Sequence, residues 1–357
     1  MKGPENIDPT IPVRQEHQFD LAKLQAYLNI QSPELGKIRE IRQYPGGFSN
    51  LTFSLRTETG TYVLRRPPKG ANIQSAHNME REFRILKTLE PHYKKIPAPV
   101  LYCDESEIIG SPFFIMSQVP GLILRGSNPP TQKLDWSKIA HALIRNLADL
   151  HQLPLEADTI DQIGKPAGYI SRQVQGWCKR YLYAQTDTLE GMDQLSTWLL
   201  QHFIEADETS LIHNDYKYDN LVLDPANPEE IRAVLDWEMA TVGHPLMDLG
   251  TTLAYWAEAE DPKMLYPYNL SWMPGNPDRG ELVRQYFEAR AMAPRNMEFF
   301  YVFGLFKVGV IAQQIYARYK QGNALDKRFE ALIHIVRSCG NQGVLALEKG
   351  RISQLYS

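Results

Sequence analysis

The sequence predicts an α+β protein with a small, β-rich N-terminal part and a larger, mainly helical part. Residues 38–66 hold three strand-like segments, and the middle one alternates Leu51, Phe53 and Leu55 with other residues. After Gly121, apolar residues recur mainly at helical spacing. The chain has 357 residues, which is more than one hydrophobic core usually serves, so we expect two lobes or domains.

The N-terminal strands are expected at residues 38–44, 51–57 and 62–66, with a turn at 58–61 before the third. A glycine-containing segment joins the first two strands and consists of Pro45, Gly46, Gly47, Phe48, Ser49 and Asn50. Glycines let backbone amides approach a phosphate group closely. An ordinary hairpin turn has a similar composition, so both interpretations stay open.

The third strand and the helix after it carry charged residues at informative positions. Val63 and Arg65 share one face of the strand, because strand side chains alternate. The helix is expected to begin near Ser75, and Glu82 falls in the middle of its apolar arc, which Ile85, Leu86 and Leu89 form. A carboxylate on a buried face needs a partner, so Glu82 either pairs with a cation or lies at a partly buried surface.

The most informative segment runs from Leu211 to Trp237. It contains the octet His213-Asn214-Asp215-Tyr216-Lys217-Tyr218-Asp219-Asn220, a short apolar segment, a turn, and a second apolar segment, 231–235, that leads to Asp236. Asp215 and Asn220 are therefore expected in one tight loop between two short strands. Asp236 is expected at the end of the following strand.

These groups are the ones that phosphoryl transfer needs, because its catalysis consists mainly of positioning and charge stabilisation. Asp215 would lie beside the attacking hydroxyl, and Lys217 would reach the transferred group as a point charge. Asn220 and Asp236 would offer the oxygen ligands that magnesium prefers. His213 is expected to brace the loop by hydrogen bonding, since no cysteine or second histidine lies at metal-ligand spacing.

The octet HNDYKYDN with an aspartate on the next strand resembles the catalytic core of protein kinases and small-molecule kinases. Asp236-Trp237-Glu238 stands in place of DFG, and no APE-like segment follows, which disfavours a protein substrate. The run from Leu235 to Leu249 resembles the aminoglycoside phosphotransferase and choline kinase superfamily. Within it, the chain is most similar to the phosphotransferase domain of acyl-CoA dehydrogenase fusion proteins.

This resemblance implies a bilobal protein-kinase-like fold with a small antiparallel β-rich N-lobe and a large, mainly α-helical C-lobe. The implied N-lobe is residues 1–117, the hinge 118–122, and the C-lobe 123–357, which carries the catalytic loop and the substrate site. ATP and Mg²⁺ are the implied cofactors. The implied nucleotide-binding residues are Gly46, Gly47, Ser49, Asn50, Val63, Arg65, Glu82, Met116, Ser117 and Val119.

Two positions depart from the family pattern. Arg65 stands where the superfamily has its phosphate-binding lysine, and Glu82 would hold it toward the phosphates as the family's helix glutamate does. Arg66 is the alternative phosphate ligand, and a pair of solvated arginines on an edge strand is the alternative without a function. His244 stands where family members often carry aspartate, close to Asp248, which is expected to organise the catalytic loop.

The resemblance implies an ATP-dependent kinase of a small-molecule hydroxyl, but it does not fix the acceptor. A hydroxyacyl-CoA is favoured slightly, with Lys179 and Arg180 or Arg290 and Arg295 as its basic residues. An aminoglycoside is the other candidate, because the acidic residues Glu258, Glu260 and Asp261 follow the Asp248 helix. A catalytically weak nucleotide-binding sensor and a magnesium-dependent phosphate ester hydrolase stay open.

The composition narrows the partners and the compartment. A net charge of −4, a pI near 6.2 and the absence of a basic stripe argue against nucleic acid or an anionic membrane as the main partner. Three cysteines without metal spacing fit a reducing cytoplasm. The longest apolar segment, 299–316, is interrupted by Lys307, Gln313 and Gln314, so we interpret it as a buried helix.

Overall fold

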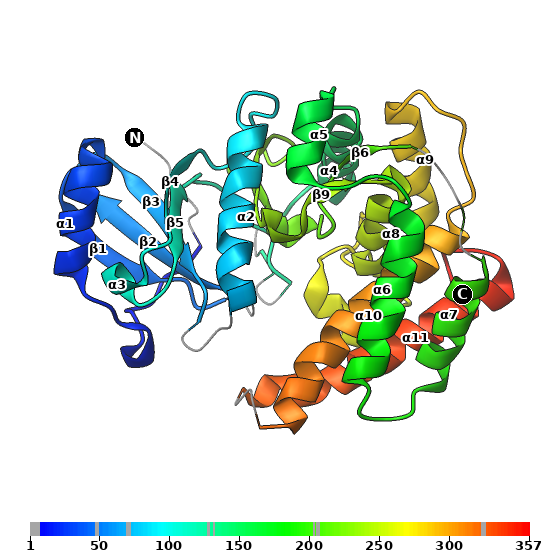
Figure 1. Ribbon diagram of the computed structural model, residues 1–357. Helices are drawn as coiled ribbons and strands as arrows, with labels where there is room; N and C mark the ends of the chain where they lie inside the picture. The colour runs from blue at the N-terminus through cyan, green and yellow to red at the C-terminus, as the bar shows by residue number, and fades with distance from the viewer. Residues whose placement is uncertain are drawn as a thin grey trace. The chain divides into compact units, whose positions relative to one another are not determined.

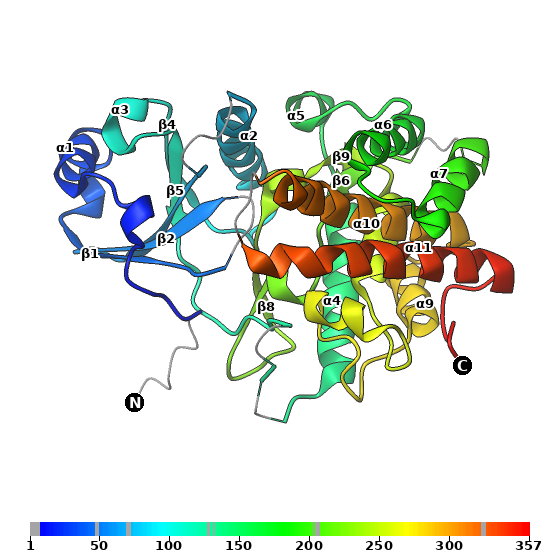
Figure 2. The same ribbon diagram turned by 90° about the horizontal axis from the view of Figure 1, so that it is seen from below.

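The structure is a computed structural model that describes residues 8–46, 50–68, 73–126, 129–130, 133–202, 204, 208–322 and 326–357 (Figures 1 and 2). Its contacts divide the chain into two compact units. The first unit joins Met1–Ile123 to Val222–Glu238, and the second joins Leu124–Leu221 to Met239–Ser357.

The first unit contains a five-stranded sheet in the order β1-β2-β3-β5-β4, with every neighbouring pair antiparallel. The strands are β1 (Ile38–Gln43), β2 (Leu51–Thr57), β3 (Thr61–Arg66), β4 (Pro99–Cys103) and β5 (Phe113–Ser117). Helices α1 (Leu21–Gln31) and α2 (Ile73–Leu89) lie on opposite sides of this sheet, and the short α3 (Ser106–Ile109) lies beside α1 (Figure 1). Helix α2 begins two residues before the predicted start at Ser75.

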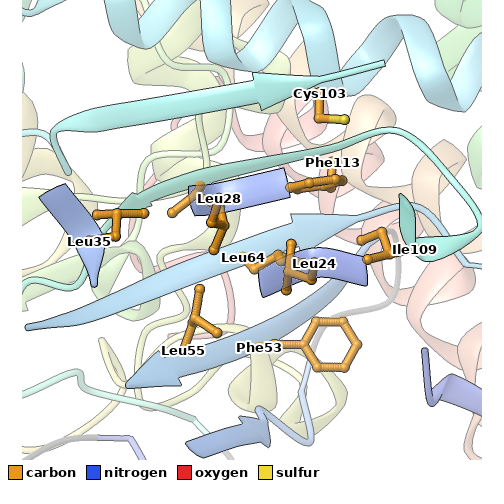
Figure 3. Close-up of a cluster of buried hydrophobic side chains, with 10 residues drawn as sticks. Leu24, Leu28, Leu35, Phe53, Leu55, Leu64, Cys103, Ile109 and Phe113 are labelled. Carbon is orange, nitrogen blue, oxygen red and sulfur yellow. The ribbon is translucent and has the colours of Figure 1, made fainter. Parts of the chain in front are cut away.

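One face of the sheet packs against α1. Its buried apolar residues include Leu24 and Leu28 of α1, Phe53 and Leu55 of β2, and Leu64 of β3 (Figure 3). Alternation along β3 therefore places Val63 and Arg65 on the opposite face, which is the face that α2 covers. The expected strand pattern of this region is confirmed.

Arg66 lies on the α1 face and not at the predicted phosphate site. Its guanidinium is buried, lies 5.0 Å from the ring centre of Phe19 and 5.6 Å from that of Phe53, and donates to the carbonyls of Ile109 at 2.8 Å and His17 at 2.7 Å. The alternative of two solvated arginines on an edge strand is also wrong, because β3 lies between β2 and β5 and both arginines are buried.

The segment 222–238 contacts the first unit, whereas the predicted lobe boundary assigned it to 123–357. It contains most of the two-stranded pair β7 (Leu221–Leu223) and β8 (Ile231–Val234). Leu122 and Leu223 form an isolated bridge, and the Val234 amide donates to the Lys95 carbonyl at 2.8 Å. A Cβ on Gly121 would lie 2.5 Å from the Leu223 carbonyl oxygen, so close backbone approach requires glycine there.

The second unit is mainly helical, with one short sheet of β6 (Ser210–Ile212) and β9 (Thr241–Gly243) paired antiparallel. Its helices are α4 (Trp136–His151), α5 (Ala157–Ile163), α6 (Tyr169–Ala184), α7 (Glu190–His202), α8 (Pro245–Tyr255), α9 (Arg279–Ala289), α10 (Glu298–Lys320) and α11 (Leu332–Lys349). Short 3-10 turns are η1 (Gln15–His17) and η2 (Pro33–Leu35) in the first unit, η4 (Trp237–Met239) at the boundary, and η3 (Tyr218–Asn220), η5 (Lys263–Tyr268) and η6 (Lys327–Ala331) in the second.

Helices α8 and α10 cross with their backbones in direct contact. A Cβ added to Gly304 would lie 2.2 Å from the carbonyl oxygen of Gly250, and one added to Gly250 would lie 2.1 Å from the carbonyl oxygen of Phe300. Glycine is therefore needed on both helices at the crossing. One turn after Gly304, the same helix carries Lys307.

Helix α10 is the one helix of the described ranges with the length and hydropathy of a membrane span. Its best window has a mean hydropathy of 1.3, and 83% of that window is buried inside the protein. The expectation of a buried helix at 299–316 is confirmed.

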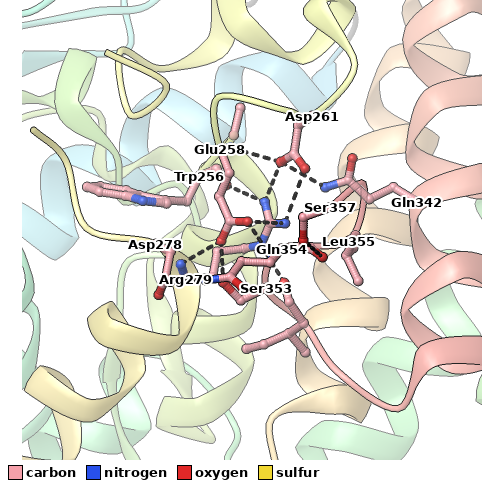
Figure 4. A network of polar contacts seen from close by, with 12 residues as sticks. Trp256, Glu258, Asp261, Asp278, Arg279, Gln342, Ser353, Gln354, Leu355 and Ser357 are labelled. Atoms are coloured by element: carbon pink, nitrogen blue, oxygen red, sulfur yellow. Dashed lines mark hydrogen bonds and ion pairs between the residues drawn. The ribbon is translucent and has the colours of Figure 1, made fainter. Parts of the chain in front are cut away.

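A buried ion-pair network in the second unit holds the C-terminal segment (Figure 4). Arg279 is fully buried, pairs with Asp261 and with Glu258 at 3.2 Å, and donates to the carbonyls of Trp256 and Ile352. Glu258 also accepts from the Ser353 hydroxyl at 2.6 Å. The proposed aminoglycoside-binding role of Glu258 and Asp261 is therefore not supported, because both carboxylates already neutralise an internal arginine.

Candidate phosphotransfer site

The predicted catalytic loop, residues 213–220, lies between β6 and β7. Its backbone begins with Asn214 in the left-handed region, at φ 68°. Tyr216 is buried, accepts from Asn146 of α4 at 2.8 Å and donates to the Leu143 carbonyl at 3.2 Å. The Tyr218 hydroxyl donates to Asn276 at 2.7 Å. The two tyrosines thus anchor the loop to the helical unit.

Asp248, in the first turn of α8, fixes the start of this loop, as the sequence predicts. Its two carboxylate oxygens accept from the backbone amides of His213 at 2.6 Å and Asn214 at 2.7 Å. His151 contacts the same carboxylate at 3.1 Å and bonds the Tyr286 hydroxyl through its other ring nitrogen. Burial favours a raised pKa for Asp248, but the bonds from His151 and the loop amides leave the pKa below its ordinary value.

We expect Asp248→Asn to lower the free energy of unfolding by about 2–3 kcal/mol, because one loop amide would face an NH2 group in a buried site. Asp248 is fully buried, so water cannot supply the lost acceptor. Urea denaturation measures the effect. Asp135→Asn is the matched control, since Asp135 caps α4 by accepting from the Lys138 amide and asparagine caps equally well. Equal stability of the two variants would contradict this role.

His244 is the N-cap of α8, the helix that carries Asp248. Its Nδ1 accepts from the Leu246 amide at 3.2 Å, and its ring stacks on Phe300 with the ring centres 5.4 Å apart. Burial lowers the pKa of His244 to about 4, so the ring is neutral at neutral pH. The neutral imidazole therefore supplies the capping acceptor at the position where family members often carry aspartate.

The lowered pKa of His244 predicts acid destabilisation. The unfolded chain, with an ordinary histidine pKa near 6.5, binds a proton that the folded chain rejects until about pH 4. Stability should therefore fall as the pH drops from 6.5 toward 4, by about 1.4 kcal/mol per pH unit for this one group. His244→Asn keeps a cap without this titration and should make urea midpoints less dependent on pH. An unchanged pH slope would refute the assignment.

Asp215, Lys217 and Asn220 converge at the end of the catalytic loop. Lys217 forms an ion pair with Asp215, and its ammonium lies 4.7 Å from the ring centre of Tyr255. Asn220 donates its Nδ2 hydrogens to the backbone oxygen and to Oδ2 of Asp215, both at 2.8 Å. The amide oxygen of Asn220 therefore points away from Asp215.

The Asp215 carboxylate is held in its charged form. Burial works against the charge, but Lys217, His213 and the Tyr255 hydroxyl together lower the pKa of Asp215 below its ordinary value. The backbone amide of Asp215 donates to Nδ1 of His213 at 3.2 Å, which is the bracing role predicted for that histidine. The loop can thus present an ionised carboxylate to a hydroxyl.

In the first unit, Arg65 forms ion pairs with three carboxylates. We call these four residues the Arg65 cluster: Arg65, Glu82, Asp236 and Glu238. Arg65 pairs with Glu82, as the position of Glu82 on the apolar arc of α2 predicts, and it contacts Asp236 at 3.2 Å and Glu238 at 3.7 Å. Burial opposes the guanidinium charge, yet the three carboxylates raise the pKa of Arg65. Burial also raises the pKa of Glu82, against the effect of Arg65.

Asp236 and Glu238 are the exposed edge of this cluster, with 34% and 24% of their side chains accessible. Asp236 has a left-handed backbone, at φ 65°, a conformation that is rare for residues other than glycine and often marks a functional position. Glu238 accepts from Asn50 at 2.8 Å, and its backbone carbonyl accepts from Arg81 at 2.8 Å. Glu238 therefore braces the cluster and the predicted phosphate loop.

The other predicted nucleotide-binding residues lie in the same unit. Val63 and Met116 are directly opposite each other on β3 and β5, and both are largely buried. Ser117 is the last residue of β5, and its hydroxyl accepts from the Ala98 amide at 2.8 Å. Val119 lies two residues after Ser117. A Cβ on Gly46 would meet no atom within 4 Å. Gly47 and Ser49 lie outside the described residues.

The predicted magnesium ligands are divided between the units, with Asp236 in the first and Asn220 in the second. Their convergence stays a prediction. Among the residues that the structure describes, no cluster of three or more histidine, cysteine, aspartate or glutamate side chains has metal-binding geometry. The chemistry of the two predicted ligands nevertheless fits magnesium, because each presents a side-chain oxygen.

Three residues near the catalytic loop were missed by the sequence analysis: His151, Tyr255 and Lys307. Each of them contacts a residue that is far away in the sequence, so no local sequence motif predicts its role. Lys307 alone left a signal, as a cation in an otherwise apolar segment.

Residues 40–283 match the model of a family described as the phosphotransferase enzyme family. The chain belongs to this family. Acyl-CoA dehydrogenase family member 11 of Rattus norvegicus is 38% identical over 323 residues, which cover 88% of this chain and 41% of that protein. Acyl-CoA dehydrogenase family member 10 of Mus musculus is 34% identical over 89% of this chain and 30% of its own length. This phosphotransferase thus spans less than half of these relatives, and the predicted likeness to them is confirmed.

A solved structure of a candidate aminoglycoside phosphotransferase from Ralstonia eutropha JMP134 is 29% identical, with a TM-score of 0.78 over 93% of this chain and 99% of that one. The GDP complex of an aminoglycoside 2'-phosphotransferase, at 17% identity, has a TM-score of 0.61 over 90% of this phosphotransferase and 99% of its own chain. That second likeness concerns the fold alone. The predicted α+β, kinase-like fold class is confirmed.

Proposed function

We propose that this phosphotransferase moves the γ-phosphoryl group of ATP, bound as its magnesium complex, to a hydroxyl group of a small molecule. The observation that carries the proposal is the catalytic loop, in which an ionised Asp215 is held beside Lys217 and Asn220. Asp215 would orient the acceptor hydroxyl and take its proton as the oxygen bonds to phosphorus. The bond from phosphorus to the bridging oxygen then breaks, and ADP leaves.

The Arg65 cluster supports binding of the nucleotide phosphates. The pKa of Arg65 is raised, so the group stays charged, and a guanidinium can bind two phosphate oxygens at once. Glu82 orients it from the buried side. Asp236 and Asn220 are the residues that would hold magnesium, because each carries a side-chain oxygen. Magnesium would supply charge neutralisation on the phosphates.

Val63 and Met116 would contact the adenine ring from the sheet, and the backbone of Ser117 and Val119 would bond its edge. The register that pairs Val63 with Met116 supports this assignment. Gly46, Gly47, Ser49 and Asn50 would cover the phosphates. Complexes with ADP and with GDP both occur among the solved structures of similar fold, so ATP and GTP are both to be assayed.

For the acceptor, we propose a hydroxyacyl-CoA or a related metabolite. The names of the curated relatives support this class, and the internal pairing of Glu258 and Asp261 weakens the case for a polycationic aminoglycoside. Arg290 and Arg295 are both paired with Glu208, whereas Lys179 and Arg180 lie exposed on α6. We therefore assign the basic contacts to Lys179 and Arg180. We further propose a cytoplasmic protein that binds neither nucleic acid nor membrane.

A mass-spectrometric screen of acceptors tests the function. Hydroxyacyl-CoA thioesters and aminoglycosides are incubated with ATP or GTP and magnesium, and with each component omitted. We expect a phosphorylated thioester that requires nucleotide and magnesium together. Phosphate release without any acceptor would favour a hydrolase. Nucleotide binding without any product across the panel would favour the nucleotide-binding sensor.

A further inference from the structure

Lys307 is a buried cation beneath the catalytic loop. Its side chain rises from α10, where nearly all neighbouring residues are apolar, and the residue is 2% exposed. The ammonium donates to the backbone carbonyl of Asn214 at 2.8 Å and to the side-chain oxygen of the same residue at 3.1 Å. Lys307 therefore forms two hydrogen bonds to Asn214, one to its backbone and one to its side chain.

Asn214 is the residue of the catalytic loop, 213–220, that has a positive φ. Its φ of 68° is unfavourable for a residue with a Cβ, and a position of this kind persists only where neighbours hold it. The Asn214 amide bonds Asp248, and its Nδ2 donates to the Met239 carbonyl at 3.1 Å. Lys307 supplies the contact to the carbonyl, which the other two do not touch.

The carbonyl that Lys307 holds belongs to the peptide group that joins Asn214 to Asp215. The N–H of the same peptide group donates to His213 Nδ1. A planar peptide fixed at its oxygen and at its N–H cannot rotate. Lys307 and His213 therefore fix, from its two edges, the peptide plane to which the Cα of Asp215 is attached.

Burial of an ammonium is costly, so an apolar residue would serve better if this position only filled the core. Burial lowers the pKa of Lys307 to about 8, and the charged groups around it are Asp248 of α8, Asp215 and Lys217 of the loop, and Arg180 of α6. The close crossing of α8 and α10 at Gly250 and Gly304 brings this lysine under the loop that Asp248 organises. The helix crossing thus places the charged Lys307 ammonium next to the catalytic loop that Asp248 also contacts.

We propose that Lys307 is a positioning residue that holds the Asn214–Asp215 peptide group and thereby aims the Asp215 carboxylate. The inference rests on the proposed function in one respect, that Asp215 acts on the acceptor hydroxyl. The conformational part of the claim stands apart from any substrate.

The test compares Lys307→Met, which keeps length but removes the ammonium, with Lys307→Arg, which keeps the charge. Gln313→Met is the matched control on the same helix, because Gln313 is also buried and bonds the Ala184 carbonyl at 2.8 Å, away from the catalytic loop. Three quantities are measured for each purified full-length variant: the Tm, the amide hydrogen exchange of peptides covering residues 211–220, and kcat and KM with ATP and the acceptor from the screen.

We expect Lys307→Met to lower kcat by about 10–100-fold with little change in the KM for ATP, because small displacements of a catalytic group have effects of this size. Loop exchange should become at least about tenfold faster. Lys307→Arg should recover part of both, and Gln313→Met should lower the Tm without either effect. If the methionine variant does not fold, Lys307→Gln replaces it, with the same direction of change expected.

The inference is overturned if Lys307→Met keeps the wild-type kcat and the wild-type loop exchange. It is also overturned if Gln313→Met loses as much kcat per degree of lowered Tm as Lys307→Met does, because the kcat loss would then reflect lost stability alone. The exchange measurement needs no substrate. If the wild type shows no turnover with any acceptor, the proposed function fails, while faster loop exchange in Lys307→Met still supports the positioning of the peptide group.

Discussion

Asp215→Asn should abolish phosphoryl transfer while leaving nucleotide binding nearly intact. The asparagine has the same shape and can keep a contact with Asn220, but it cannot take the proton of the acceptor hydroxyl. We expect kcat to fall by about 1,000-fold or more, since one proton-accepting group contributes about 100- to 10,000-fold. The affinity for ATP should change by less than about threefold, because the proposed phosphate and adenine contacts belong to other residues.

The measurement combines single-turnover kinetics with calorimetric titration of ATP and magnesium. Asp224→Asn is a suitable control, since Asp224 follows β7 and pairs with Arg232 instead of the catalytic loop. A variant at position 215 that turns over at the wild-type rate would remove this residue from the mechanism. A variant that also loses ATP binding would show that the substitution disturbs more than the proton acceptor.

Arg279→Met should be the most destabilising single change among those considered. It would leave Asp261 buried without its cation and Glu258 without its main partner, and a broken buried ion pair costs about 3–5 kcal/mol. The C-terminal segment should loosen as well, because Arg279 also donates to the Ile352 carbonyl. Urea denaturation reports the first effect, and hydrogen exchange of residues 350–357 reports the second.

Arg284→Met provides the comparison on the same helix. Arg284 is exposed and pairs with Glu281 and Glu288, and such surface pairs contribute little to stability. The difference between the two variants therefore isolates the effect of burial. Equal denaturation midpoints for both would mean that the Arg279 network is not what stabilises this part of the second unit.

The sequence predicted best where the chemistry is local. The octet from His213 to Asn220 is contiguous, so its spacing alone indicated one loop that holds Asp215 and Asn220 together. Glu82 was assigned by helical phase, and the ion pair with Arg65 follows because both lie on the faces that the period and the strand alternation give them.

It predicted worst where a side chain depends on distant partners. Arg66 was the alternative to Arg65 as the phosphate ligand. Strand alternation places its side chain on the α1 face, where it contacts the rings of Phe19 and Phe53 and donates to two backbone carbonyls. Glu258 and Asp261 looked like a free acidic cluster because Arg279 and the C-terminal segment are 18 or more residues away. The same reason hid the partners of Lys307.

The two compact units of the structure divide the chain differently from the predicted lobes. Residues 222–238 follow the catalytic loop directly, so they were assigned to the larger part of the chain. Beside the bonds within this segment, several of its hydrogen bonds go to Leu122, Lys95, Arg65 and Asn50, which are all N-terminal. A chain segment packs with the residues that pair its backbone N–H and C=O groups and its charged side chains, and sequence order does not reveal which residues these are.

Tracing the γ-phosphoryl group tests the central claim most directly. The enzyme is incubated with magnesium, a hydroxyacyl-CoA acceptor and ATP whose γ-phosphate carries heavy oxygen. The account predicts a phosphorylated acceptor whose phosphorus carries the three heavy non-bridging oxygens of ATP and is bonded to the light hydroxyl oxygen of the acceptor. The wild type should form this product, and Asp215→Asn should not. Heavy phosphate released to water with no labelled acceptor, or equal labelling by the Asp215→Asn variant, would contradict it.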